Sequence, residues 1–276
     1  MKHFIKDCWG GMDREKLDAI LWRHISSLPY FRALLRAVED RFYQDIQLPE
    51  PVFDLGSGDG HFASVAFDKK IDVGMDPWVA PTLEARRRNT YQLLVLGEGA
   101  DIPYATGSFG SVISTSVLEH IPDLTPVLLE VSRILKPGGK FVFCVPNHRF
   151  PEKLWGRKVL TKLGLSKFGE AYGRFFNRIA RHQHTDPPIL WQSRLEQAGF
   201  DLIETWDYFP PKALYVLEWG HPLGLPALIS KKLFDRWVLV PKRWARAIPW
   251  KLTRKHLDNP KSEEGVCSFF IARSRA

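Results

Sequence analysis

A glycine-rich turn at residues 52–60 constrains this chain more than any other stretch. The sequence VFDLGSGDG brings a short apolar run to an acid, Asp54, and then places glycines at the alternate positions 56, 58 and 60. The apolar spacing at 61–67 is one that a helix can carry. Glycine tolerates positive φ and lets a ligand lie against bare backbone, and a helix N-terminus presents unpaired N–H groups. The stretch therefore predicts a strand, a tight turn and a helix that bind a nucleotide-like ligand.

Strands and helices alternate after this turn. Short apolar runs predict further strands at 71–76, 93–96, 110–116 and 140–145, and helical apolar spacing occupies 124–135. Such alternation implies a parallel sheet that binds its ligand at the carboxyl ends of the strands.

Ahead of the first strand, residues 13–45 predict two helices that Pro29 separates. These helices either pack on the sheet or form a lid over the site, because helices commonly cover pockets on sheets of this kind. Both alternatives stay open at the level of sequence.

A second acidic residue follows the glycine turn at a spacing close to that of nucleotide-binding βαβ units. Asp76 ends the predicted second strand and lies 16 positions beyond Gly60. In βαβ nucleotide sites, a carboxylate about 20 residues after the glycines binds the ribose hydroxyls. The turn and Asp76 together are more specific than either feature alone. Trp78 comes two residues later, where it either stacks on a base or packs within the fold.

The composition indicates a globular chain whose positive charge is unevenly distributed. The 276 residues are 45% hydrophobic, which is enough for a sizeable core, and their net charge is +8. Segment 149–183 holds nine Lys and Arg against two acids, and segment 209–256 holds ten against two. An anionic partner is expected at these two segments.

Targeting signals and cysteines indicate a cytoplasmic protein. The sequence has no run of about 18 apolar residues, and its first residues lack the apolar core of a signal peptide. Cys8, Cys144 and Cys267 are widely separated, with no pair at metal or redox spacing. We therefore expect reduced thiols and no membrane span.

Several motifs resemble those of one family. They are the glycine turn with Asp54, Asp76, the segments ADIPY at 100–104 and VLEHIPD at 117–123, and LKPGGK at 135–140. In this order they resemble the class I S-adenosylmethionine-dependent methyltransferases, nearest the type 11 group that methylates small molecules and lipids. The resemblance implies an α/β fold, a Rossmann-like doubly wound sheet of seven strands in the order 3-2-1-4-5-7-6, with strand 7 antiparallel and helical insertions.

The resemblance also implies a domain organisation and a cofactor site for S-adenosyl-L-methionine. Residues 1–276 would form one methyltransferase domain, with an N-terminal helical lid at 1–48, a cofactor-binding core at 52–147, and basic amphipathic insertions at 149–183 and 209–256. The implied cofactor-binding residues are Asp54, Gly56, Ser57, Gly58, Gly60, Asp76, Pro77, Asp101, Ile102 and Ser116.

Within that set, the resemblance implies specific contacts. Gly56 and Gly58 would pass under the methionine part, Asp76 would bind the ribose hydroxyls, and Asp101 and Ile102 would hold the adenine. Carboxylates at both ends suit a ligand with a diol and an exocyclic amine. A dinucleotide such as NAD is disfavoured, because the turn has GxGxG rather than GxGxxG spacing.

Methyl transfer requires an aligned acceptor and, for a hydroxyl acceptor, a base. His120 and His148 both follow predicted strands, so they are the first candidates, with Glu119 behind them and His184 on the acceptor side; each could instead serve packing. Glu119-His120 resembles part of the metal-binding ExxEH of some quinone-biosynthesis methyltransferases. Ser116 replaces the first Glu of that motif, so we expect no metal.

The two basic insertions mix apolar and aromatic residues with Lys and Arg. They would dock on an anionic membrane or lipid substrate, or only cover the site. Nucleic acid is less favoured, because polar base-reading side chains are scarce among them. We predict a methyltransferase for a small, lipophilic or lipid-linked acceptor, peripheral at the inner face of a membrane. The alternatives are an RNA methyltransferase and a non-catalytic module that keeps the cofactor fold.

Overall fold

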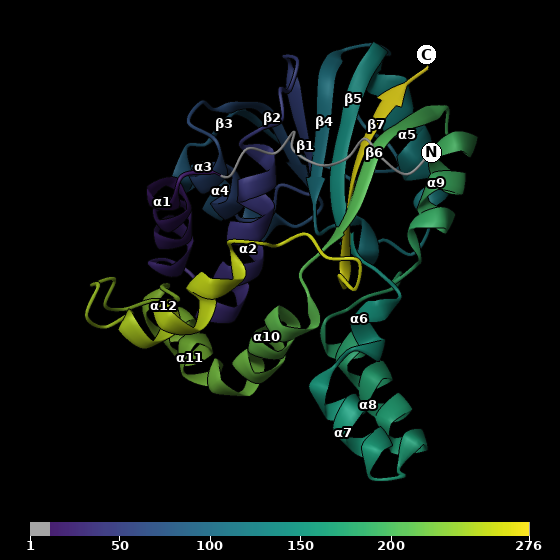
Figure 1. Ribbon diagram of the computed structural model, residues 1–276. Helices are drawn as coiled ribbons and strands as arrows, with labels where there is room; N and C mark the ends of the chain where they lie inside the picture. Colours follow the sequence, from purple (N-terminus) through teal and green to yellow (C-terminus); the bar gives the residue numbers. More distant parts are fainter. Residues whose placement is uncertain (1–11, 276) are drawn as a thin grey trace.

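Seven strands form one sheet in the order β3-β2-β1-β4-β5-β7-β6. The structure is a computed structural model that describes residues 12–275, apart from the side chains of Leu223 and Leu225 (Figure 1). Cys8 and the first eleven residues of the expected lid lie outside this range. The strands are β1 (Val52–Leu55), β2 (Ile71–Asp76), β3 (Tyr91–Leu96), β4 (Phe109–Thr115), β5 (Leu135–Pro146), β6 (Phe200–Tyr208) and β7 (Cys267–Ser274).

The pairing of these strands matches the predicted fold. β1 to β5 pair in parallel, and β7 runs antiparallel to both of its neighbours, β5 and β6. β4 is buried along its whole length, as expected for a central parallel strand covered on both faces. The carboxyl ends of β1, β2 and β4 therefore lie next to one another at one edge of the sheet, which confirms the predicted arrangement.

Helices cover both faces of the sheet (Figure 1). One face carries α5 and α9, which bury Val131 and Trp191 against the strands. The other face carries α3 and α4 together with the N-terminal helices α1 and α2, and Pro29 separates α1 from α2 as predicted. These elements are α1 (Arg14–Ile25), α2 (Tyr30–Tyr43), α3 (His61–Ala66), α4 (Val79–Arg88), the 3-10 turn η1 (Leu118–His120), α5 (Leu124–Ile134) and α9 (Pro188–Gln197).

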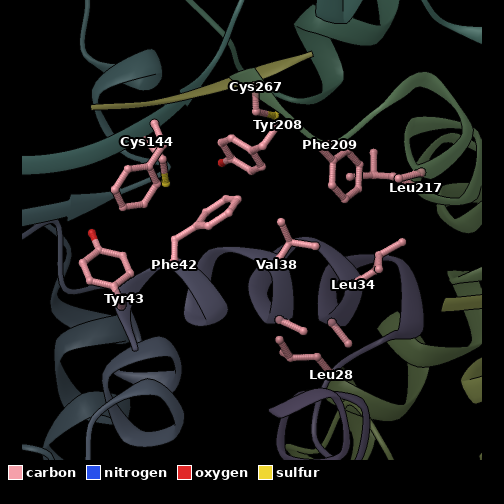
Figure 2. Packing of buried hydrophobic residues seen from close by; sticks show 14 of the residues in the cluster. Leu28, Leu34, Val38, Phe42, Tyr43, Cys144, Tyr208, Phe209, Leu217 and Cys267 are labelled. Atoms are coloured by element: carbon pink, nitrogen blue, oxygen red, sulfur yellow. The ribbon is translucent and has the colours of Figure 1, made fainter. Parts of the chain in front are cut away.

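Helix α2 is the hub of the packing on its face. Figure 2 shows Leu34, Val38 and Phe42 along one side of this helix, with Tyr208 and Leu217 across from them. All five side chains are buried. Phe42 also makes edge contacts with the ring of Tyr208, at a centroid distance of 5.2 Å. The helix is thus fixed between the end of β6 and the second insertion.

The two basic insertions adopt different arrangements. The first is a helical hairpin, α7 against α8, that Figure 1 shows extending away from the sheet. The second folds back, so that α10 and α12 both pack on α2. Their elements are α6 (Arg149–Glu152), α7 (Trp155–Lys162), α8 (Ser166–Ile179), α10 (Pro211–Leu223), α11 (Leu225–Phe234), α12 (Ala247–Thr253) and the 3-10 turn η2 (Arg254–His256).

Cys144 and Cys267 are buried free thiols on the neighbouring strands β5 and β7. Among the helices of the described range, none combines the length and apolar character that a membrane span requires. Within residues 12–275 no group of three or more His, Cys, Asp or Glu side chains is arranged to hold a metal ion.

Candidate functional site

A cavity of about 970 Å³ opens at the carboxyl ends of β1, β2 and β4. This edge is where parallel α/β sheets bind ligands, since the loops that follow the strands meet there. The strand ends contribute the glycine turn, Asp76 and Val117 to the wall. Leu28 and two arginines of α2 form another part, and Lys231 and Trp237 of the second insertion complete it. Helix α2 therefore packs on the sheet and lines the cavity as well.

The glycine turn is shaped for close approach of a ligand. Gly56 has φ +78°, and a Cβ there would lie 2.4 Å from Val117. Gly58 has φ +53° with open space beyond it. L-residues rarely adopt such angles, so both positions favour glycine. The buried hydroxyl of Ser57 lines the cavity and has no hydrogen-bond partner in the described structure, so it can donate to or accept from a ligand.

Two aspartates line the cavity beside this turn, and they differ in their hydrogen-bond partners. The Asp54 carboxyl is buried, which raises its pKa to about 7, although a 2.6 Å hydrogen bond from the Tyr91 hydroxyl opposes that rise. Asp76 accepts the backbone N–H groups of Gly58 and Trp78, each at 2.9 Å. A carboxylate has about four acceptor sites, so Asp76 can still accept from a diol. The open turn, the unpartnered serine and this carboxylate fit a nucleoside ligand of the predicted kind.

The remaining predicted cofactor residues divide between the cavity and its surroundings. Pro77 and Ser116 line the cavity, whereas Gly60 caps α3 behind it. Asp101 is exposed outside the lining, and Ile102 is buried in the core below α5. The same loop reaches the cavity through four earlier residues, Gly97, Glu98, Gly99 and Ala100. Sequence reasoning missed Glu98, although its position in an acidic loop after the third strand was a usable signal.

A buried polar network joins helix α2 to the end of β4. Arg36 on α2 donates to Glu39 at 2.7 Å and to the carbonyl of Thr115 at 3.3 Å. Glu39 also accepts the hydroxyls of Ser116, at 2.9 Å, and Tyr208, at 3.1 Å. Burial acts to lower the pKa of Arg36, but Glu39 outweighs it and holds that pKa above its usual value. Ser116, with φ +52°, is therefore held in place from beneath the cavity.

Of the candidate bases, His120 is the one that lines the cavity. Its Nδ1–H donates to the carbonyl of Arg181 at 3.0 Å, since a carbonyl can only accept. In the neutral ring the lone pair therefore resides on Nε2. Desolvation lowers the pKa of His120 below its usual value, so the ring is neutral at pH 7. The neighbouring Glu119 is buried, which raises its pKa to about 8, and its Oε1 lies 3.7 Å from Nε2 of His120.

The other predicted catalytic residues lie away from the cavity wall. His184 donates from Nε2 to the carbonyl of Ile121 at 3.0 Å, which fastens the end of the first insertion to the loop after η1. His148 precedes α6, and its Nδ1 is buried without a partner in the described structure. Glu119 is likewise absent from the lining, and its backbone carbonyl accepts the N–H groups of Gln183 and His184.

Several lining residues were not predicted from the sequence. His61 lines the cavity, with Nε2 2.7 Å from the Ser27 hydroxyl, and burial lowers its pKa to about 3. The others are Arg32, Arg36, Lys231 and Trp237. Arg36 carried a weak signal, a charge within the apolar spacing of a helix, whereas nothing local marks Lys231 or Trp237 among the many cations and tryptophans of their segment.

Comparison with known proteins bears on this site. A family model described as a methyltransferase domain matches residues 53–143. A demethylmenaquinone methyltransferase from Beutenbergia cavernae is 31% identical over 186 residues, which cover 66% of this chain and 64% of that protein. The chain thus matches a little under two thirds of that relative's length. An uncharacterized methyltransferase from Mycobacterium sp. (strain JLS) is 32% identical, with 72% of this chain and 69% of that protein covered.

Solved structures agree on the fold. A SAM-dependent methyltransferase from Thermotoga maritima superposes with a TM-score of 0.54 at 15% identity, covering 87% of this chain and 89% of that one. Geranyl diphosphate C-methyltransferase from Streptomyces coelicolor, solved with S-adenosyl-L-homocysteine, gives 0.51 at 15% identity, with coverage of 86% and 77%. With the glycine turn, the sheet order and these relatives together, the chain belongs to the class I S-adenosylmethionine-dependent methyltransferases.

Proposed function

We propose that the chain transfers a methyl group from S-adenosyl-L-methionine to a small, lipid-like acceptor. The observation that carries this proposal is the single cavity whose wall includes the glycine turn, Asp76 and His120. The cofactor supplies an electrophilic methyl group on a sulfonium, so the protein mainly has to align the acceptor and exclude water. Helices α2 and α11 contribute to that exclusion by walling the cavity.

In this proposal the backbone at Gly56 and Gly58 lies against the methionine part, and Asp76 accepts from the ribose hydroxyls. Asp101 and Ile102 are assigned to the adenine by the family pattern alone, and Glu98 is a further acceptor for its amine. Removing one charged hydrogen-bond partner costs about 1.5–3 kcal/mol. We therefore expect Asp76→Asn to weaken S-adenosyl-L-homocysteine binding roughly ten- to hundred-fold by calorimetry, and the exposed control Asp68→Asn to leave it unchanged. Unchanged binding in the Asp76 variant would refute this assignment.

His120 is the proposed general base for a hydroxyl acceptor. With Nδ1 engaged by Arg181, the Nε2 lone pair is available to take the acceptor proton as the methyl group is transferred. Proton transfer of this kind contributes about 10²- to 10⁴-fold. His148, His184 and Glu119 are kept as supporting residues of the surrounding loops in this proposal.

The lipid-like character of the acceptor is inferred from two features. Apolar side chains, among them Leu28, Phe62 and Val127, line the cavity beside the polar groups. Curated relatives named demethylmenaquinone methyltransferase match this chain over a large part of its length. Such an acceptor resides in a membrane, so we further propose that the cytoplasmic protein binds peripherally to an anionic membrane surface. The exposed apolar residues between lysines at the turn of the α7–α8 hairpin suit that contact.

The decisive experiment incubates the full chain with methyl-labelled S-adenosyl-L-methionine and a bacterial lipid extract, in its reduced and oxidised forms. We expect label in the organic phase, and its loss in His120→Gln. Parallel reactions contain total RNA instead of lipid. Label in RNA and none in the organic phase would replace the proposal with the nucleic-acid alternative, and binding of cofactor without any transfer would favour a non-catalytic module.

A further inference from the structure

Three cationic side chains line the cavity, and the structure leaves one of them without a counter-charge. Arg36 is paired with Glu39 at 2.7 Å. Lys231 is paired with Glu84 at 2.8 Å and with Asp235 at 2.7 Å. Arg32, by contrast, makes no ion pair or hydrogen bond with any residue between 12 and 275. Its charge is therefore the one cavity cation in the described structure that has no carboxylate partner.

The position of Arg32 makes its charge available to a ligand in the cavity. Its guanidinium carbon lies 5.3 Å from the ring centroid of Trp237, so the aromatic face provides its nearest favourable contact. The Arg32 side chain is exposed toward the open cavity, and partial desolvation by the cavity wall, followed by repulsion from Arg36, lowers the pKa of Arg32. Asp59 acts on it only through space and is itself 3.3 Å from Arg88. An anion in the cavity would offset the repulsion between Arg32 and Arg36.

The segments that carry this pair indicate which ligand supplies the anion. Arg32 belongs to α2 and Trp237 follows α11, and both lie outside residues 53–143, the part of the chain that matches the methyltransferase family model. The cofactor is common to the family, so its site belongs to the matched part. The wall formed by α2 and the second insertion lies outside that matched part, where it is suited to the acceptor. Leu28 and Phe62, which also line the cavity, are apolar neighbours for the rest of such a ligand.

We propose that Arg32, covered by Trp237, binds a carboxylate or phosphate group of an amphiphilic acceptor. This inference rests on the proposed methyl transfer and adds to it the chemical class of the acceptor: an anionic amphiphile rather than a neutral lipid. The planar guanidinium can donate two parallel hydrogen bonds to either anion, which an ammonium cannot do. Arg36 holds the second positive charge one helical turn away, where it reinforces the attraction without losing its bond to Glu39.

The test measures binding to the full chain saturated with S-adenosyl-L-homocysteine. Laurate, dodecyl phosphate and neutral dodecanol, each below its micelle concentration, serve as probes in calorimetry. We expect at least one of the two anions to bind ten-fold or more tighter than dodecanol, and Arg32→Gln to reduce that preference to within twofold. Arg32→Lys should retain part of it, and Lys232→Gln, which removes an exposed cation beside Lys231, should retain all of it. Because Arg32 bonds to no described residue, its replacement should leave the thermal midpoint unchanged.

Two outcomes would overturn the proposal. One is an anion preference that is absent from the native protein or survives in Arg32→Gln. The other is a loss of affinity in Arg32→Gln for S-adenosyl-L-homocysteine but not for 5′-methylthioadenosine, which lacks the amino-acid part; Arg32 would then bind the cofactor's own carboxylate. Failure of the native chain to bind S-adenosyl-L-homocysteine at all is a separate result, and it would refute the proposed function instead.

Discussion

The two basic insertions look alike in sequence and differ in what their apolar residues contact. Each combines about ten Lys and Arg with two acids and a dense set of aliphatic and aromatic residues. In the second insertion, α10 buries Ala213, Leu214 and Leu217 against α2 and its surroundings. In the first, α7 has no buried residue, and the turn after it exposes Leu163, Leu165 and Phe168. Amphipathic composition therefore does not show whether an insertion packs on the fold or projects from it. That depends on whether another part of the fold packs against its apolar residues.

The difference has a functional side as well. The second insertion supplies Lys231 and Trp237 to the cavity wall, so it is part of the site. The hairpin contributes no lining residue, yet the loop at its end holds His120 through the carbonyl of Arg181. One insertion thus shapes the cavity directly, and the other acts on it through the orientation of one side chain.

The largest expected effect compares one substitution in the two insertions. Leu214→Ala removes a fully buried side chain and should lower the free energy of unfolding by about 2–5 kcal/mol. Leu163 is 68% exposed, so Leu163→Ala should lower the free energy of unfolding by less than about 0.5 kcal/mol. Denaturant unfolding of both variants measures the difference. Equal losses would mean that the hairpin is packed in solution and would remove the contrast.

The next effect concerns membranes. Changing Leu163 and Phe168 together to Asp should weaken association with vesicles of anionic phospholipid by about 10²- to 10⁴-fold, since burial of each side chain is worth about 1.5–3 kcal/mol. Sedimentation at low and high salt measures it, and salt should weaken the native association. The matched control changes Leu233 and Phe234 of α11, which are similarly exposed, to Asp. A control that loses as much would make both insertions membrane-binding, and no association of the native chain would remove the idea.

A smaller effect is expected where the two insertions meet. Glu218 on α10 accepts the N–H groups of Trp155 and Gly156, at 2.6 and 2.9 Å, and the hydroxyl of Tyr172 at 2.7 Å. Glu218→Gln replaces one acceptor oxygen by a donor, so the start of α7 should be destabilised by about 1–3 kcal/mol. Hydrogen exchange should become faster across 155–179 and not in the sheet. The exposed control Glu263→Gln should change nothing, and unaltered exchange in the hairpin would show that Glu218 does not anchor it.

Local patterns predicted the parts of this molecule whose geometry is local. The glycine turn and the strand-end acid Asp76 followed from residue types at short spacings, whereas the sheet order followed from the family resemblance, and the structure shows all three as expected. The Arg36–Glu39 network could not be predicted, because it depends on where α2 docks relative to Ser116, 77 positions beyond Glu39.

The histidines illustrate the same limit. His120 and His148 both follow predicted strands and His184 was expected on the acceptor side, but only the fold shows which of the three lines the cavity. Two of the rings bond to segments about 60 positions away: His120 to a carbonyl at the end of the hairpin, and His184 to a carbonyl of the loop after η1. Trp237 and Lys231 likewise reach the cavity because α10 packs on α2, a contact that no spacing within 209–256 encodes.

The smallest expected effect tests whether the hairpin influences the chemistry. A base must be neutral to accept a proton, and burial lowers the pKa of His120 below its usual value. Protonation of His120 should therefore leave methyl transfer level, within about twofold, from pH 8 down to the ordinary histidine pKa near 6.5, and should lower it only below that pH. Asp54 and Glu119, whose pKa values burial raises to about 7 and about 8, ionise within the same range, so any slope above pH 6.5 is assigned to them. The rate of label transfer to the organic phase, measured as kcat/KM across this range, checks the profile.

The same profile in Glu218→Gln separates the hairpin's anchor from its final loop. Gln183 and His184 fasten that loop to the carbonyl of Glu119, at 2.7 and 3.1 Å, independently of Glu218. If those bonds suffice, loosening the start of α7 leaves His120 desolvated. The value of kcat/KM then falls at the same pH as in the native chain. If kcat/KM instead falls at a pH closer to 6.5, the whole hairpin shields His120 from solvent. In that case both insertions would shield the site from solvent. They would then differ only in how far they lie from the cavity.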